Sequence, residues 1–230
     1  MKKNILILFT IICGLHISSC DDMLDNIQPY LDEGEKVYVG KVDSLTARSG
    51  KNRILLQGLY LYGLTQKKCI ISWVTTEDEK KSLELDVVRK EPIDKFEVMI
   101  EDLEEGQYEF SIRTYDSKGN SSIVSVIDGY AYGETYQSNL VNRKVEKITQ
   151  QDGNLIISWR TINTALSCEV YYTDLAGKEI MKEIPASEME TQLSDCDTTK
   201  SIRWRTVYLP EKTAIDKFYT EYAEQIIVPN

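Results

Sequence analysis

The alternation of apolar and polar residues is most regular between Ile100 and Ser122. Tyr108, Phe110 and Ile112 fall on one side of the chain and their polar neighbours on the other, which is typical of a strand with one solvated face. The Glu-Glu-Gly before this strand and the segment 116–120 after it carry turn residues. We therefore expect a hairpin here.

The same alternation predicts further short strands on both sides of this hairpin. They cover residues 37–40, 53–62, 68–74, 82–89, 95–100 and 122–127. Seven short strands and no helical period between residues 35 and 132 are typical of an antiparallel sandwich of two sheets. The first half of the chain is thus expected to be all-β.

The pattern starts again in the second half. Strands are expected at residues 154–160, 166–173, 178–184, 189–193, 201–208 and 217–228. Trp159 falls on the apolar side of its strand, and at the corresponding position of the first half stands Gly58, where we expect Trp73 to fill the volume. The expected segments are a signal peptide 1–19, a tether 20–34, a first sandwich 35–133, a linker 134–142 and a second sandwich 143–230.

Two motifs give these sandwiches a resemblance to a known module. Leu103-x-x-Gly106-x-Tyr108 before the alternating strand resembles the E–F corner and F strand of fibronectin type III domains, with an inward tyrosine. The predicted strand 154–160, with Trp159 on its apolar side, is similar to their B strand. The resemblance implies two tandem fibronectin type III/immunoglobulin-like β-sandwiches, a fold that carries many unrelated functions.

The N-terminus has the features of an export signal. A basic start precedes the apolar stretch 5–15, which is shorter than the ~20 residues of a membrane-spanning helix. Ile17-Ser18-Ser19-Cys20 resembles a bacterial lipobox, which implies cleavage before Cys20 and acylation of its sulfur, hence a membrane anchor. The alternative is a secreted protein without lipid. Asp21-Asp22 resembles the surface-export signal of Bacteroidetes lipoproteins, which implies the outer face of the outer membrane, with the periplasmic leaflet as the alternative.

Several longer motifs lie at residues 39–45, 50–53, 100–122, 132–143, 208–211 and 214–218. Together they resemble a family of Bacteroidetes lipoproteins of unknown function that occur with outer-membrane glycan-uptake systems. The resemblance implies polysaccharide or glycan-uptake proteins as partners. Some members carry a further galactose-binding-like domain, which we do not expect after Asn230.

Charge and composition exclude several kinds of partner and chemistry. The formal net charge of −10 disfavours nucleic acid and anionic lipid head groups. The single histidine, His16, leaves with the signal peptide, so we expect neither a Ser-His-Asp or Cys-His nucleophile nor a histidine-ligated metal. A hydrolase with paired carboxylates stays formally open. We expect no enzyme, no cofactor and no metal, and we interpret 116–120 as a β-turn and not a calcium loop.

Tyrosines are the remaining candidates for binding, because a sugar ring stacks well on an aromatic face. The chain has 14 Tyr and 4 Phe. Tyr130, Tyr132 and Tyr136 surround the expected linker, where sites between domains often form. The alternative is that these rings pack the two modules together.

Three cysteines remain after the anchor, and two kinds of modification stay open. Cys69 and Cys168 lie in apolar runs and are expected to be buried thiols, while a Cys168–Cys196 disulfide remains possible in an exported chain. Ser44 and Thr198 lie in short patterns that resemble the O-glycosylation sites of exported Bacteroidetes proteins.

The sequence thus predicts a non-catalytic outer-membrane lipoprotein. Its expected role is that of an accessory of a surface polysaccharide-acquisition complex, which binds glycan weakly or docks to the transport machinery. The alternative is a structural or adhesive protein that binds other proteins at the cell surface.

Overall fold

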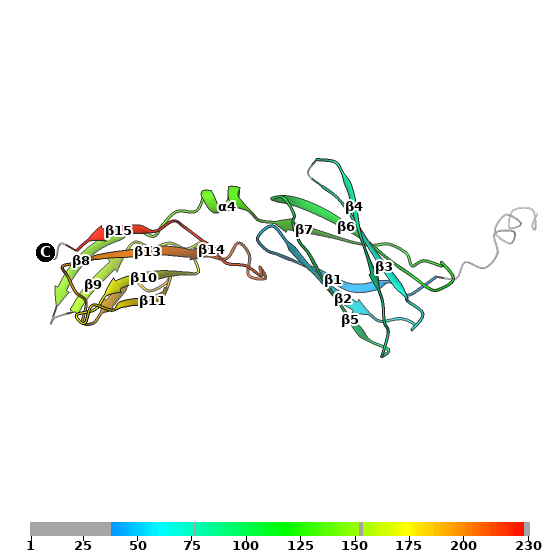
Figure 1. Ribbon diagram of the computed structural model, residues 1–230, viewed down its shortest axis with the longest axis horizontal. Helices are drawn as coiled ribbons and strands as arrows, with labels where there is room; N and C mark the ends of the chain where they lie inside the picture. The colour runs from blue at the N-terminus through cyan, green and yellow to red at the C-terminus, as the bar shows by residue number, and fades with distance from the viewer. Residues whose placement is uncertain (1–37, 76, 152–153, 228–230) are drawn as a thin grey trace, which may run out of the picture. The chain divides into compact units, whose positions relative to one another are not determined.

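The computed structural model describes residues 38–75, 77–151 and 154–227. In this part of the chain nearly all regular structure is antiparallel strand, and the single short helix is α4 (Glu134–Ser138) (Figure 1). No helix in the described ranges is long and apolar enough to cross a membrane. The expected signal peptide, Cys20 and the tether 20–34 lie outside the described residues.

The first sandwich consists of two sheets around one core. The order is β1-β2-β5 in one sheet and β4-β3-β6-β7 in the other. Ile54, Leu56, Ile71 and Phe110 are fully buried between the sheets. The strands are β1 (Val42–Ser49), β2 (Ile54–Tyr60), β3 (Lys68–Val74), β4 (Lys80–Asp86), β5 (Asp94–Ile100), β6 (Gly106–Tyr115) and β7 (Ser125–Ala131).

The second sandwich repeats this arrangement. Its sheets have the orders β12-β9-β8 and β11-β10-β13-β14, and β15 pairs with β13 as well. Trp159, Cys168 and Ile184 are fully buried between them. The strands are β8 (Val145–Gln151), β9 (Asn154–Trp159), β10 (Ser167–Thr173), β11 (Glu179–Pro185), β12 (Glu190–Leu193), β13 (Ser201–Tyr208), β14 (Phe218–Tyr219) and β15 (Ala223–Ile226). The predicted all-β class with two sandwiches is confirmed; the predicted domain limits stay predictions.

A tyrosine corner closes the first sandwich as the sequence predicts. Tyr108 lies at the start of β6, its side chain is buried, and its hydroxyl donates a hydrogen bond of 3.0 Å to the carbonyl of Glu104. In the turn that follows β6, Asp116 Oδ1 accepts hydrogen bonds from the amides of Lys118 and Asn120, and Gly119 has φ +87°. The predicted β-turn is therefore present.

The first strand of each sandwich differs from the prediction. Residues 38–41 are not in a strand, and the chain pairs only from Val42, while β8 was not predicted at all. Register shifts interrupt both strands, between Asp43 and Thr46 in β1 and between Val145 and Lys147 in β8. Because such a bulge adds a residue to one strand, apolar residues no longer alternate with polar ones there. Ser44 lies in the first bulge, with φ +52°.

The linker is partly helical, which the sequence analysis did not predict. The carboxylate of Glu105 accepts hydrogen bonds from the amides of Thr135 (2.7 Å) and Tyr136 (2.8 Å), two of the amides that the first turn of α4 leaves unpaired. A carboxylate from the first sandwich therefore fixes where this helix begins.

The structure describes the surroundings of Gly58 and Trp73 and the state of the three cysteines. A Cβ on Gly58 would meet Asp43 O at 2.8 Å and Val42 Cγ1 at 2.9 Å, so β1 approaches this position closely, while Trp73 packs against Phe110 at 6.0 Å between ring centroids. Cys69, Cys168 and Cys196 are all buried free thiols. Cys168 and Cys196 form no disulfide, and burial raises the pKa of Cys168 to about 12.

Candidate binding site

The structure brings the three predicted tyrosines together. Tyr130 lies on β7, Tyr132 follows that strand and Tyr136 lies in α4; the ring centroids are 4.7 Å apart for Tyr130 and Tyr132 and 4.8 Å for Tyr132 and Tyr136. Phe218 of β14 packs edge to face against Tyr136 at 5.0 Å. The contacts of Tyr132 and Tyr136 are those of packing residues. Whether the three tyrosines bind a ligand stays a prediction.

Tyr132 also makes a polar contact with the segment that joins β13 to β14. Its hydroxyl donates to Glu211 Oε1 at 3.2 Å, and Ser49 Oγ donates to the same oxygen at 2.9 Å. Burial and the Glu211 carboxylate raise the pKa of Tyr132 to about 12, so its hydroxyl stays protonated well beyond neutral pH.

Residues 209–217 form a loop that docks on the turn between β1 and β2, and we call this segment the docking loop. The amide of Ile215 donates to the carbonyl of Ser49 at 2.8 Å, and the Arg48 Nε–H donates to the carbonyl of Thr213 at 2.8 Å. The backbone amide of Lys51 donates to Asp216 Oδ2 at 2.8 Å. Backbone and side-chain groups of the turn and of the docking loop thus satisfy each other.

One ion pair lies at the centre of this contact. Arg53 donates from Nε and Nη2 to the two carboxylate oxygens of Asp216, at 2.9 Å and 2.7 Å. These bonds hold the pKa of Asp216 below its usual range. A Cβ on Gly50 would lie 2.5 Å from Asp216 Oδ2 and 2.8 Å from Ile215 Cγ1, so only glycine fits between the turn and the docking loop.

Four of the six motifs that carry the family resemblance meet at this junction, although they are distant in the sequence: 50–53, 132–143, 208–211 and 214–218. Asn52, with φ +54°, donates from its backbone amide to the Tyr132 carbonyl at 2.7 Å and from its side chain to the Leu103 carbonyl at 2.9 Å. The other residues of these motifs at the junction are Gly50, Arg53, Gly133, Tyr136, Glu211, Ile215, Asp216 and Phe218. These four motifs therefore contain the residues of the contact between the sandwiches.

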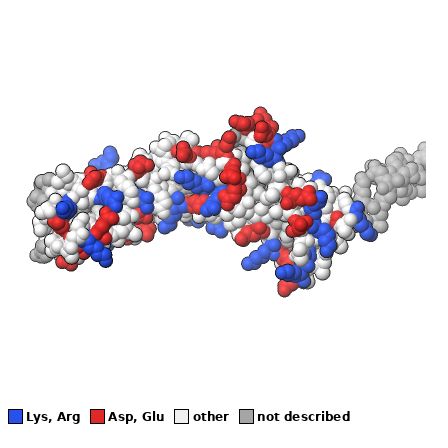
Figure 2. Space-filling model, viewed as in Figure 1, with Lys and Arg blue, Asp and Glu red and all other residues white. Residues whose placement is uncertain are grey.

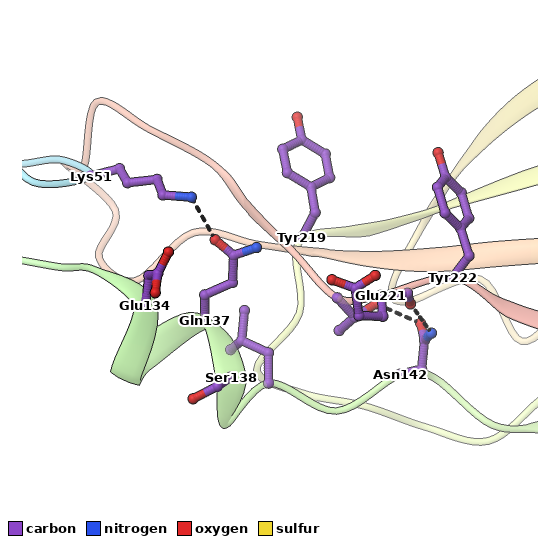
Figure 3. Close-up of a pocket in the computed structure, with 10 residues that line it drawn as sticks. Lys51, Glu134, Gln137, Ser138, Asn142, Tyr219, Glu221 and Tyr222 are labelled. Atoms are coloured by element: carbon purple, nitrogen blue, oxygen red, sulfur yellow. Dashed lines mark hydrogen bonds between the residues drawn. The ribbon is translucent and has the colours of Figure 1, made fainter.

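An open pocket of about 620 Å³ lies beside the junction (Figure 3). Lys51 and residues of α4 line one side, where Lys51 Nζ donates to Gln137 Oε1 at 2.8 Å. Tyr219, Glu221 and Tyr222 line the other side with Asn142. Figure 3 shows the ring of Tyr219, on β14, and the ring of Tyr222, just before β15, pointing the same way along this side of the pocket.

The pocket tyrosines continue into a ladder of rings and guanidinium groups on the outer face of the sheet. Arg205 lies over Tyr219 at 4.2 Å from the ring centroid and over Tyr222 at 5.1 Å. Arg203 lies over Tyr222 at 4.9 Å and over Tyr171 at 4.8 Å. Such stacking orients the rings, and it leaves Tyr219 as the end of the ladder that borders the pocket.

Carboxylates balance both arginines of the ladder. Arg205 Nε donates to Glu169 Oε2 at 2.6 Å, and Arg203 Nη2 donates to Glu179 Oε1 at 2.9 Å. The face in view in Figure 2 likewise shows basic and acidic side chains interspersed. A neutral ligand with hydroxyl groups fits this surface better than a polyanion does.

The sequence analysis missed Tyr219 and Tyr222. Their segment, Phe218-Tyr219-Thr220-Glu221-Tyr222, is the densest aromatic stretch near the C-terminus, and this density was the available signal. Among the described residues no group of three His, Cys, Asp or Glu side chains could hold a metal ion.

The sheets and the tyrosine corner define the class: the chain folds into two fibronectin type III-like β-sandwiches joined by a docked loop. A family model matches residues 20–218, and the chain belongs to this family, DUF4998, a domain of unknown function. No curated protein matches the chain.

Among solved structures the chain is similar to a two-domain fibronectin type III segment of chicken tenascin, with 13% identity over 80% of this chain and 97% of that chain and a TM-score of 0.34. It is also similar to the FN1–FN3 domains of chicken CNTN1, with 13% identity over 81% of this chain and 64% of that chain and a TM-score of 0.41.

Proposed function

We propose that this protein is a non-catalytic accessory of a surface polysaccharide-acquisition complex, anchored to the outer membrane by lipid on Cys20, and that it binds glycan weakly at the junction pocket. The observation that carries the proposal is the ring of Tyr219, which Arg205 orients at the edge of an open pocket. Sugar C–H faces stack on aromatic rings, and the amide of Gln137 and the carboxylates of Glu134 and Glu221 suit sugar hydroxyl groups.

The absence of catalysis is part of the proposal. No catalytic family is indicated by the comparisons, and the only histidine precedes Cys20. We therefore assign the pocket to binding and not to hydrolysis.

Glycan binding is tested with the mature chain carrying Cys20→Ser, on a panel of soluble polysaccharides. We expect saturable binding to at least one glycan, weakened about fivefold by Tyr219→Ala, because a stacking contact contributes about 1 kcal/mol. Tyr130→Ala is the matched control, since this exposed tyrosine does not line the pocket. Loss of binding with Tyr130→Ala and not with Tyr219→Ala would move the site to the tyrosines predicted from the sequence.

The second candidate is a structural or adhesive protein that contacts other proteins. It is favoured by the internal pairing of the pocket's polar groups, since Asn142 accepts hydrogen bonds from Thr206 and Thr220 and donates to the Glu221 carbonyl. No binding across the glycan panel would contradict glycan binding at the pocket. A transport protein that then co-purifies with the chain would support docking to the transport machinery, whereas a surface protein outside that machinery would support the structural or adhesive role.

The anchor has its own test. Cys20→Ser in the full chain should move the protein from the membrane fraction to the soluble fraction, and unchanged fractionation would contradict acylation at this residue. Protease treatment of intact cells should cleave the wild-type protein; complete protection would place it on the periplasmic leaflet.

A further inference from the structure

Three loops of the first sandwich lie at the same end. Lys68, the first residue of β3, pairs with Asp86 at the end of β4 and with Tyr115 at the end of β6. Tyr60 at the end of β2 pairs with Asp94 at the start of β5. The loops 61–67, 87–93 and 116–124 therefore share one end, opposite the turn between β3 and β4 (Figure 1).

These loops expose large apolar side chains. The five side chains that are each more than half exposed are Tyr62, Leu64, Val88, Ile93 and Ile123, with Val88 at 75%. We call them the loop rim. Single exposed apolar residues are ordinary on a protein surface, but several gathered on neighbouring loops indicate a surface that contacts something apolar.

The loops of the rim are held in place by a buried arginine. The Arg89 side chain is 1% exposed and pairs with Asp94 at 2.9 Å. It donates to the Gly63 carbonyl at 2.8 Å in the first loop, and to the Glu91 and Pro92 carbonyls at 3.0 Å each in the second. Because these bonds tie the loops 61–67 and 87–93 together, they fix the positions of the apolar side chains that these two loops expose to solvent.

The chain enters the first sandwich beside the rim. The amide of Val39 donates to the Ser121 carbonyl at 3.4 Å, and Thr114 Oγ1 donates to the Gly40 carbonyl at 2.7 Å. Cys20 stands 19 positions before Val39. Whatever conformation they take, these residues span at most about 65 Å, so a lipid on Cys20 holds Val39, where the chain enters the sandwich, within that distance of the membrane.

We propose that the loop rim inserts into the interface of the lipid surface that holds Cys20, so that the protein rests on the membrane through this end of the first sandwich. The proposal rests on the anchor of the proposed function. Tyrosine and aliphatic side chains suit the boundary between head groups and acyl chains, and Lys67 and Lys90 are exposed on the same loops. Since the chain is acidic, burial of apolar side chains carries the interaction, and attraction to anionic head groups does not.

The test uses the mature chain with Cys20→Ser, so that no acyl chain contributes, and flotation with zwitterionic phosphatidylcholine vesicles. We expect measurable co-flotation that drops at least tenfold in the triple variant Leu64→Glu/Val88→Glu/Ile93→Glu. The matched control is Leu175→Glu/Met181→Glu/Ile226→Glu, three residues of the second sandwich that are also more than half exposed. Thermal unfolding of each variant checks that it is folded.

The outcomes separate this proposal from the anchor. No flotation of the parent chain, or equal loss in both triple variants, would overturn the rim as a membrane contact. Because the parent chain carries no lipid, either result leaves acylation of Cys20 to the fractionation experiment. Flotation that is lost only in the rim variant supports the rim as a membrane contact, and the fractionation experiment then decides whether the membrane it contacts is the one that holds Cys20.

Discussion

Individual side chains fix the corners of the sandwiches, and Tyr108 is the clearest case. Its ring stacks against Phe110 at 6.0 Å between centroids while its hydroxyl satisfies the Glu104 carbonyl. The sequence predicted this residue because the corner motif is local: the leucine, the glycine and the tyrosine lie within six positions. One hydroxyl thus links the end of a loop to the start of the central strand.

Removal of this hydroxyl should cost measurable stability. We expect Tyr108→Phe to lower the free energy of unfolding by about 1 kcal/mol, because it leaves the Glu104 carbonyl without this partner and keeps the ring. Chemical denaturation measures the change. Tyr62→Phe, at an exposed tyrosine, should have no effect, and equal losses in both variants would contradict a special role of the corner.

The burial of arginine side chains could not be predicted from the sequence, and Arg143 is an example. Arg143 is almost completely buried, donates to the Arg160 and Glu188 carbonyls at 3.0 Å and 2.6 Å, and lies over the Trp159 ring. Burial lowers its pKa, and the backbone carbonyls offset that desolvation. Its partners are backbone groups distant in sequence, so the pattern of side chains alone could not identify this residue as part of the core.

At the scale of elements, the regular strands could be predicted and the bulged strands could not. The limits predicted for β3 and β13 agree with the structure, and no register shift interrupts the pairing of either strand. β8 has the sequence Val-Glu-Lys-Ile-Thr-Gln-Gln, in which the two apolar residues are three positions apart because the bulge falls between them. The pairing of β8 continues after the bulge because of its hydrogen bonds to β9, and the sequence of β8 alone does not show this.

The docking loop is the element that joins the sandwiches, and Gly50 allows its close approach. We expect Gly50→Ala to displace residues 209–217, since the new methyl group would overlap Asp216 and Ile215. The displaced loop should be cleaved by trypsin after Lys212 or Lys217 at least several times faster than the wild-type loop.

The control for this change is Gly177→Ala. Gly177 has φ +85° in the turn between β10 and β11 and has no neighbour within 4 Å of an added Cβ. This substitution strains its own turn and should leave cleavage of the docking loop unchanged. Equal acceleration in both variants would indicate general destabilisation and not release of the loop.

At the scale of the whole molecule, the sequence predicted the repeated sandwich but not the site. The pocket unites Lys51, α4 and the segment 219–222, which come together only when the docking loop is in place. Of the predicted tyrosines, Tyr132 and Tyr136 pack on Phe218 and Tyr130 packs on Tyr132, and none of the three lines the pocket. The aromatic rings that border the pocket are set by the contact between the sandwiches, which composition and proximity to the linker could not predict.

Hydrogen bonds of the docking loop hold the two sandwiches together, and this contact shapes the pocket beside it. Amide hydrogen exchange at Ile215 and Lys51 measures whether the contact forms in solution, because both amides donate across the junction. We expect both amides to exchange at least a hundredfold more slowly than in an unstructured peptide, and we expect Asp216→Ala to remove the protection of Lys51. Exchange of both wild-type amides at the rate of an unstructured peptide would contradict this contact between the sandwiches.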